Sequence, residues 1–193
     1  IMQRSGRIDA LVNNAGIDAG QAVEETPLQV VREIFETNYF GTVSVLRAVT
    51  PIMRKQRSGR IVNVGSLAGR VVMGCHAHYS ASKWAMEGMS EALAFEMAEF
   101  NVKVAIIQPG VVVTPIWGKG GELPAGDYPY AKSLQRLMRF FEFGFTRPAM
   151  PADVAIAIAD AIESDQPHFR YPVGFDAVET IAARNKVSDA EWI

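Results

Sequence analysis

Three short runs of apolar, mostly β-branched residues divide the chain, and each run ends in a loop that contains glycine. The runs lie at residues 8–12, 60–64 and 102–108, and helix-like stretches separate them. Strands that alternate with helices indicate an α/β fold with a parallel sheet, because parallel strands need long crossover connections. The nearly continuous apolar run at 102–107 is typical of a strand covered on both faces. We therefore expect a doubly wound parallel sheet in which all three strands, including 8–12, are buried.

The composition fits one soluble globular domain, with 193 residues of which 49% are hydrophobic. The net charge of −2 gives no basic surface that would favour nucleic acid or an anionic membrane. No apolar run reaches the roughly 18 residues of a membrane-spanning helix, and the chain does not start with a secretory signal. A single cysteine, Cys75, excludes an internal disulfide and fits a reducing compartment, so we expect a cytoplasmic protein.

The residues with the clearest chemical potential follow the second predicted strand. Ser66 stands where that strand ends, and Tyr79 and Lys83 stand four residues apart near the start of a helical pattern. Residues at this spacing share a helix face, with Cβ atoms about 5–6 Å apart. The Lys83 ammonium is therefore expected to lower the pKa of the Tyr79 phenol from its ordinary value of about 10. A phenol tuned in this way suits proton exchange with an alcohol or carbonyl oxygen.

A tyrosine–lysine pair is a weak signal by itself, because the chain contains a second one at Tyr128-Pro-Tyr-Ala-Lys132. Pro129 disfavours the α conformation for Tyr128, so we expect the second pair not to share a helix face. The first pair differs from it in its neighbours. These are Ser66, the Asn13-Asn14-Ala15-Gly16 sequence after the first predicted strand, and Pro109-Gly110 after the third.

Taken together, these motifs resemble the short-chain dehydrogenase/reductase family. The matching positions are Asn13-Asn14-Ala15-Gly16, Asn38, Ser66, Tyr79-x-x-x-Lys83 and Pro109-Gly110-x-x-x-Thr114. The resemblance covers residues 8–115 and, as a fold, extends to residue 174. It implies a Rossmann-like, NAD(P)-dependent oxidoreductase that interconverts a secondary alcohol and a ketone.

The resemblance also implies roles for individual residues. Tyr79 would exchange the hydroxyl proton, Lys83 would bond the nicotinamide ribose, and Ser66 would hydrogen-bond the substrate oxygen. Asn38, which has poor propensity for the middle of a helix, would shape the helix and hold a water in a proton relay to Lys83. The implied cofactor-binding positions are Asn14, Ala15, Gly16, Tyr79, Lys83, Pro109, Gly110, Val112 and Thr114.

Each of these assignments has a simpler alternative that the sequence leaves open. Residues 13–16 could form an ordinary turn, since asparagine and glycine are common turn formers. Asn38 could face solvent, and the valines at 111–113 could extend a strand instead of facing the nicotinamide carboxamide. Metal binding is not expected, because no carboxylate stands at zinc-ligand spacing beside His76 and His78. Either histidine could line the substrate pocket.

One element of the family pattern is missing from this sequence. The family begins with a glycine-rich turn that places the pyrophosphate at a helix N-terminus. Gly118-Lys119-Gly120-Gly121 is no substitute, because no strand leads into it, and we interpret it as a mobile loop. We interpret residues 1–193 as a single, partial domain that lacks the first βα units. The residue that distinguishes NAD from NADP belongs to that nucleotide half, so the cofactor is expected to be either one.

Proline positions and helical spacing predict the remaining elements. Thr26-Pro27 is typical of an N-cap followed by the first helical residue, and the helix would extend to about residue 56. Pro51 predicts a kink or break near Thr50. Pro151 would start a helix that ends at residue 162, and residues 168–173 would form a last strand. The tail at 175–193 has a weak helical pattern and no identifiable chemistry.

Residues 115–147 are expected to form a lid over the substrate. Glycine and proline dominate its first part, and an apolar helical stripe follows at Leu134, Leu137, Met138 and Phe141. Phe140, Phe143 and Phe145 add bulk. By resemblance, this lid would suit an apolar molecule such as a steroid, a retinoid or a fatty alcohol. Alternatively, its aromatic side chains only pack the lid onto the sheet.

Two other function classes stay open. Helices at 27–56 and 79–99 correspond to those that the family uses for dimerisation, so a non-catalytic homo-oligomeric scaffold is the first alternative. An epimerase or dehydratase is the second, because a fold does not determine its chemistry. If the protein is an oxidoreductase, we expect it to act on a small-molecule substrate and to form a homodimer or homotetramer.

Overall fold

Four parallel strands form the sheet, and their spatial order β1-β2-β3-β4 follows the order of the chain. The computed structural model describes residues 2–119 and 127–193. The strands are β1 (Ala10–Asn13), β2 (Gly59–Val64), β3 (Val102–Pro109) and β4 (Arg170–Val173). Their register pairs Ala10 with Arg60, Gly59 with Val102, and Ile106 with Arg170. The prediction of an α/β fold with a parallel sheet is confirmed.

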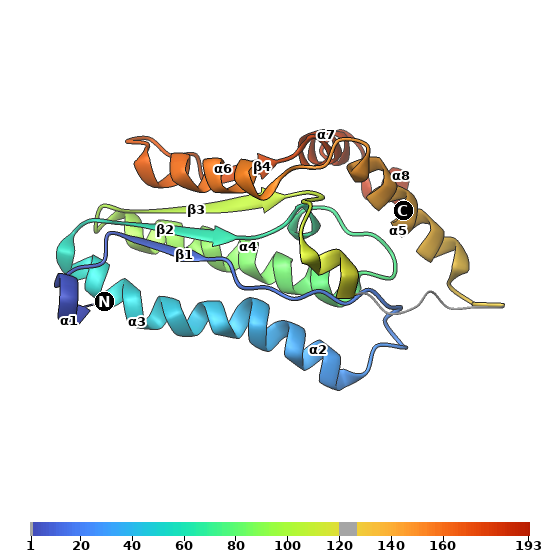
Figure 1. Ribbon diagram of the computed structural model, residues 1–193, viewed down its shortest axis with the longest axis horizontal. Coiled ribbons are helices and arrows are strands. Elements are labelled where there is room, and N and C mark those ends of the chain that lie inside the picture. The colour runs from blue at the N-terminus through green and yellow to red at the C-terminus, as the bar shows by residue number, and fades with distance from the viewer. Residues whose placement is uncertain (1, 120–126) are drawn as a thin grey trace.

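Helices cover both faces of this sheet (Figure 1). On one face lie α2 (Leu28–Phe35), the π-helical turn η1 (Glu36–Phe40), α3 (Gly41–Gln56) and α4 (Ala77–Ala98), and on the other lies α6 (Pro151–Glu163). Successive side chains of a strand point to opposite faces. Ile61 accordingly packs with Met53 of α3 and Met97 of α4, whereas Val62 packs with Ala161 of α6. The sheet therefore has one core on each side.

The remaining elements gather mostly where the strands end. The turns η2 (Leu67–Gly69) and η3 (Pro115–Lys119) and the helices α5 (Ala131–Phe145) and α7 (Phe175–Arg184) lie near the carboxyl ends of the strands (Figure 1). Two short helices, α1 (Met2–Ser5) and α8 (Asp189–Trp192), complete the described chain. The predicted lid therefore corresponds to η3 and α5. Its residues 120–126, which include Gly120 and Gly121 of the predicted loop, lie outside the described residues.

The prediction that the first strand is buried is wrong. β1 starts two residues later than expected, and its side chains are alternately exposed and half-buried, with Val12 38% exposed. The reason is its position, because among the described residues β2 is the only strand that pairs with β1. β1 is therefore at the edge of the sheet that the described residues form. Apolar character alone does not distinguish an edge strand from an interior one.

The long helix after residue 27 is interrupted at a different place from the predicted one. α3 continues through Pro51, and the interruption is η1, which contains Asn38. Proline removes one helical hydrogen bond, but Val49 and Met53 on either side of Pro51 are buried in the core and hold the helix in place. Thr26 is not the N-cap either, because its hydroxyl donates to the Ala22 carbonyl at 2.9 Å.

The C-terminal part follows the sequence prediction closely. α6 starts at Pro151 as expected, and β4 covers the last four residues of the predicted strand at 168–173. The weak helical pattern of the tail corresponds to α7 and α8. Within residues 2–119 and 127–193, none of the helices has both the length and the apolar character needed to cross a membrane.

Candidate active site

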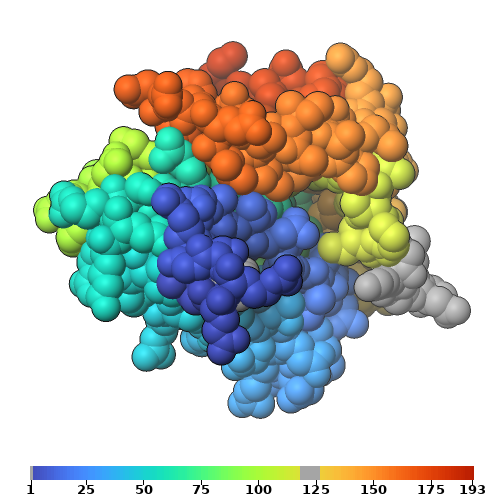
Figure 2. Space-filling model, turned by 60° about the vertical axis from the view of Figure 1, so that its left-hand side comes forward, coloured from blue at the N-terminus to red at the C-terminus, as the bar shows by residue number. Residues whose placement is uncertain are grey.

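A cavity of about 530 Å³ opens at the carboxyl edge of the sheet. Open α/β sheets bind their ligands at this edge, in the crevice beyond the strand ends. In Figure 2 the surface is hollowed where the segment after β1 (blue), α6 (orange) and η3 (yellow) approach one another. Much of the lining is apolar, and this part includes Leu67, Val71, Met73, Val112, Ile116, Trp117, Phe140 and Phe141.

Ser66, Tyr79 and Lys83 all line this cavity. Ser66 directly follows β2, and its Oγ accepts a hydrogen bond from the Ala68 N–H at 3.1 Å, which caps η2. Tyr79 and Lys83 lie in the first turns of α4, with the Lys83 Nζ 5.7 Å from the centre of the phenol ring. Ser66 is close enough to the Tyr79 phenol to lower its pKa. The structure thus brings three of the four predicted catalytic side chains together.

The pKa of Tyr79 is shifted in the direction opposite to our expectation. Burial raises the pKa of the phenol far above its ordinary value, and the negative charge of Asp18 adds to the rise. Ser66 lowers this pKa, but by less. The cause is desolvation, which disfavours the phenolate more than the neighbouring groups stabilise it. In the structure described here, Tyr79 is therefore a protonated phenol at neutral pH.

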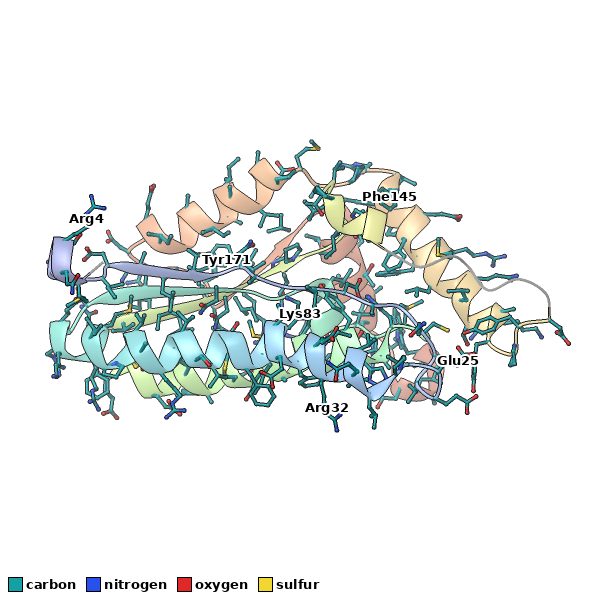
Figure 3. All side chains as sticks on the ribbon, turned by 60° about the horizontal axis from the view of Figure 1, so that its bottom comes forward. Arg4, Glu25, Arg32, Lys83, Phe145 and Tyr171 are labelled. Carbon is teal, nitrogen blue, oxygen red and sulfur yellow. The ribbon has the colours of Figure 1, made fainter. Side chains whose placement is uncertain are left out.

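Lys83 is a buried ammonium with a near-neutral pKa. Burial lowers the pKa of Lys83 to about 8, and the charge of Asp18 partly opposes this shift. Its Nζ donates to the Val64 backbone carbonyl at 3.1 Å. Figure 3 shows Lys83 inside the molecule, whereas Arg4 and Arg32 extend from its outer surface. A group that titrates near neutrality is suited to accept and return protons.

Asn38 is buried behind the cavity and does not line it, so the alternative of a solvent-facing side chain is wrong. Its Oδ1 accepts from the Ile17 N–H at 2.8 Å, and its Nδ2 donates to the Ile17 carbonyl at 3.0 Å. The second Nδ2 proton goes to the Ser82 Oγ at 2.9 Å, and Ser82 donates to the Tyr79 backbone carbonyl at 2.7 Å. Asn38 therefore joins the loop after β1 to the start of α4.

Most of the predicted cofactor-binding positions also line the cavity. These are Asn14, Gly16, Tyr79, Lys83, Pro109, Gly110, Val112 and Thr114. Ala15 differs, because it is exposed and is not part of the lining. The predicted strand extension at 111–113 amounts to one bridge between Val112 and Ala149. Of the two histidines, His76 lines the cavity and His78 does not.

The aromatic residues of the predicted lid have two functions in the structure. Trp117 packs edge-on against Phe141 and Phe145, with ring centres 5.0 Å apart in both pairs. Phe140 and Phe141 line the cavity, whereas Phe143 packs on Phe175 of α7. The lid residues thus supply part of the cavity wall and also pack onto the domain, so they do more than pack, and a covering role over a substrate stays a prediction.

Asp176 is a cavity residue that the sequence analysis missed. It lies in the first turn of α7 and is 1% exposed, and its Oδ2 accepts from the Val111 N–H at 2.7 Å. Burial raises the pKa of this carboxyl group. Gly110, Gly144 and Gly174 surround it closely. The available signal was an acidic residue in the first turn of a helix that follows a strand end, where the helix dipole favours negative charge.

A Gly110→Ala variant is expected to be less stable by about 1–3 kcal/mol, the usual cost of an added methyl group in a tightly packed site. A Cβ at Gly110 would overlap the Asp176 carboxylate. Chemical denaturation measures the free energy of unfolding. Gly20→Ala is the matched control, because its Cβ would meet only the Cys75 carbonyl at an ordinary 3.5 Å. Equal stability of the two variants would contradict the close packing around Asp176.

Among the described residues, no group of three or more His, Cys, Asp or Glu side chains is arranged to hold a metal ion. Cys75 is a free, buried cysteine, and burial raises the pKa of its thiol. Among the described residues, the cavity that contains Ser66, Tyr79 and Lys83 therefore remains the candidate active site.

A parallel α/β sheet with serine, tyrosine and lysine in one cavity at its carboxyl edge defines a Rossmann-like protein of the dinucleotide-dependent class. The family model described as short chain dehydrogenase matches residues 1–122. The chain belongs to the short-chain dehydrogenase/reductase family, whose NAD(P)-binding Rossmann fold and oxidoreductase chemistry the sequence motifs indicated.

Curated relatives support this assignment over nearly the whole chain. An uncharacterized oxidoreductase of Schizosaccharomyces pombe is 37% identical over 190 residues, which cover 97% of this chain and 79% of the relative. A 3-ketodihydrosphingosine reductase of Bacteroides thetaiotaomicron is 37% identical over 188 residues, covering 96% and 70%. Retinol dehydrogenase 8 of Bos taurus is 36% identical over 176 residues, covering 86% and 56%.

Solved structures show the same fold. The crystal structure of a short-chain dehydrogenase from Streptomyces avermitilis superposes with a TM-score of 0.85 at 37% identity, covering 98% of this chain and 69% of that one. A short-chain dehydrogenase from Burkholderia cenocepacia in complex with NADP gives 0.73 at 27% identity, covering 98% and 68%. An NAD⁺-bound xylitol dehydrogenase gives 0.72 at 27% identity, covering 90% and 70%.

Proposed function

We propose that this protein is an NAD(P)-dependent oxidoreductase that interconverts a secondary alcohol and a ketone on an apolar substrate. The observation that carries the proposal is the shared cavity of Ser66, Tyr79 and Lys83, in which these polar groups face a largely apolar wall. A substrate oxygen near Ser66 and Tyr79 would leave the hydrocarbon part against that wall. Burial of this part would provide binding energy without specific polar contacts.

The residues of the cavity fit the nicotinamide and ribose end of a dinucleotide. Gly16 leaves room beside Lys83, since a Cβ there would lie 3.4 Å from the Lys83 Nζ and 3.5 Å from the Asn38 Oδ1. The Lys83 ammonium has three protons to donate, and Val64 is the only hydrogen-bond acceptor that it meets among the described residues. Asn14, Thr114 and Lys83 would hold this end of the cofactor. When bound, the nicotinamide supplies or accepts the hydride.

In ketone reduction, Tyr79 would act as the proton donor. Its raised pKa keeps the phenol protonated at neutral pH, and Ser66 would hydrogen-bond the same substrate oxygen. In alcohol oxidation the phenol must first lose its proton. Lys83, with a pKa of about 8, would then exchange protons near Tyr79, and the proposed relay through Asn38 would connect Lys83 to solvent.

The kind of substrate is proposed from the aromatic wall of the cavity. Trp117, Phe140 and Phe141 line it, which suits a steroid, a retinoid or a fatty alcohol. The names of two relatives, a retinol dehydrogenase and a 3-ketodihydrosphingosine reductase, support the same class. Structural relatives bound to NAD⁺ and to NADP support both cofactors equally.

For a series of unbranched secondary alcohols, kcat/KM is expected to rise with chain length until the cavity is full. Each added methylene contributes about 0.8 kcal/mol on burial, which corresponds to about fourfold per carbon. The measurement is the absorbance of reduced cofactor, with NAD and with NADP. Tertiary alcohols of equal length are the control. Their carbinol carbon has no hydrogen that could leave as a hydride, so they should give no signal. A flat series would contradict the apolar-substrate proposal.

The same assay separates the proposed function from its alternatives. A scaffold would show no turnover with either cofactor, and an epimerase or dehydratase would convert its substrate without net change in reduced cofactor. A homodimer or homotetramer stays a prediction. The exposed Trp84 and Phe95, which share one face of α4, support it. A cytoplasmic location also stays a prediction.

A further inference from the structure

His76 and Asp18 form a polar contact beside Tyr79. The His76 Nε2–H donates to the Asp18 carboxylate, with its two oxygens at 2.9 and 3.0 Å. The imidazole lies flat against the phenol ring of Tyr79, with ring centres 4.8 Å apart and an angle of 22° between the planes. Both His76 and Asp18 line the cavity. The pair therefore connects the loop after β1 to the residue on which the proposed chemistry depends.

The backbone around His76 fixes this arrangement. His76 is the N-cap residue of α4, and Cys75 before it has a φ of 61°, in the left-handed region that non-glycine residues rarely adopt. Such conformations persist where the surrounding structure holds them, and they cluster at functional sites. Phe141 of α5 also supports the imidazole, because the two rings pack at nearly a right angle with their centres 5.7 Å apart. His76 is 7% exposed and has little freedom to turn.

The charges around Tyr79 come from few groups. The ionisable residues that line the cavity are Asp18, His76, Tyr79, Lys83 and Asp176. Asp176 is bound to the Val111 N–H on the far side of the loop after β3, and the facing residue of α5, Phe141, is apolar. Asp18 is thus the acidic group that acts on both Tyr79 and Lys83.

We propose that Asp18 and His76 are a positioning pair for Tyr79: the carboxylate holds the imidazole against the phenol ring, and together they set the orientation and the charge environment of the phenol. This inference rests on the proposed function of Tyr79. The contact that the structure shows is with the face of the Tyr79 ring, so the effect of the pair is exerted through Tyr79. The negative charge of Asp18 raises the pKa of Tyr79 and that of Lys83, which agrees with the proposed influence on the charge environment.

An Asp18→Asn variant tests the effect of the Asp18 negative charge on Tyr79 and Lys83. The amide can still accept the hydrogen bond from His76, but the negative charge is lost, so the pKa values of Tyr79 and Lys83 are expected to fall. The pH profile of alcohol oxidation should move to lower pH by at least about 0.3 unit, a factor of two in the protonation equilibrium. The ionisation of the Lys83 ammonium, followed by NMR during a pH titration without cofactor and identified by its absence in Lys83→Met, should shift in the same direction.

Two variants, His76→Ala and His76→Phe, test whether the imidazole ring holds the Tyr79 phenol in position. Removal of the ring leaves the phenol unsupported, and kcat is expected to fall about tenfold or more, since small displacements of a reacting group reduce rates strongly. Phenylalanine restores a flat ring, and kcat should return to within about threefold of wild type. His168→Ala is the matched control, because His168 packs against Tyr171 at 5.8 Å outside the cavity, and its kcat should not change.

The outcomes separate this inference from the proposed function. If the wild-type protein shows no turnover, the proposed function fails, and the NMR titration still tests the effect of the Asp18 charge on Lys83 beside Tyr79. If the wild type is active, an unchanged pH profile in Asp18→Asn overturns the role of the charge. An unchanged kcat in His76→Ala, or a His76→Phe variant as slow as His76→Ala, overturns the role of the ring.

Discussion

A Tyr79→Phe variant is expected to lose turnover by about a hundredfold to ten-thousandfold, the range that a positioned acid or base contributes. The ring should keep its place, because its contacts with His76 and the Lys83 ammonium involve its face. Only the hydroxyl and its influence on Ser66 are lost. The loss should therefore appear in kcat, with cofactor binding retained. Steady-state kinetics and a fluorescence titration with NAD or NADP measure the two quantities.

Tyr128→Phe provides the control for this prediction. Tyr128 begins the second Tyr-x-x-x-Lys sequence, but it precedes α5, and its hydroxyl donates to Glu25 at the surface. The variant should turn over substrate at the wild-type rate. If Tyr79→Phe stays within tenfold of wild type on an alcohol, Tyr79 is not the proton-exchanging group.

Replacement of Asn38 by alanine is expected to reduce the free energy of unfolding by about 2–4 kcal/mol. The variant loses the three hydrogen bonds of the Asn38 side chain. The buried Ser82 hydroxyl keeps its bond to the Tyr79 carbonyl but loses the donor to its oxygen, and the Ile17 backbone N–H and carbonyl lose their Asn38 partners. A buried polar group without its partner costs about 1–3 kcal/mol. A cavity left by the removed amide adds to this loss. Denaturant unfolding measures the change.

An exposed side-chain hydrogen bond in the same helical region provides the comparison for Asn38. The Gln29 Nε2 donates to Glu33 at 2.9 Å on the surface of α2. Gln29→Ala should change stability by no more than about 0.5 kcal/mol, as is usual for surface substitutions. If both variants lose equally little, Asn38 does not join the loop after β1 to α4 in the way described. Turnover of Asn38→Ala should also fall, because the start of α4 carries Tyr79.

The sequence predicted the layers of this fold better than its local details. Apolar runs at 60–64 and 102–108 identified the central strands, because both faces of these strands are buried. The same signal overestimated the burial of residues 8–12, since hydrophobicity does not indicate how many neighbours a strand has. Pro51 was a misleading signal for a helix break, because the burial of Met53 beside it outweighs one lost hydrogen bond.

The candidate site could be predicted where its residues lie close together in sequence or follow a strand end. Ser66 follows the end of β2, Tyr79 and Lys83 stand four residues apart, and the structure places all three in one cavity. Asp18 and Asp176 also follow strand ends, but no neighbouring residue in the sequence marks them as functional. Their importance depends on contacts with residues 58 and 65 positions away, and no local pattern encodes such contacts. The direction of the Tyr79 pKa shift was wrong for a related reason, because desolvation depends on the complete packing around the ring.

The strand order has a consequence for how this protein acquires its activity. The cavity walls come from segments that follow β1, β2, β3 and β4 in turn, so no single stretch of chain contains a working site. Contacts between distant segments form slowly, since each requires the closure of a long loop. A molecule in which the C-terminal segment has not yet docked would have its tyrosine and lysine on α4 but no enclosed space beside them. Catalytic competence would therefore be among the last properties to emerge during folding.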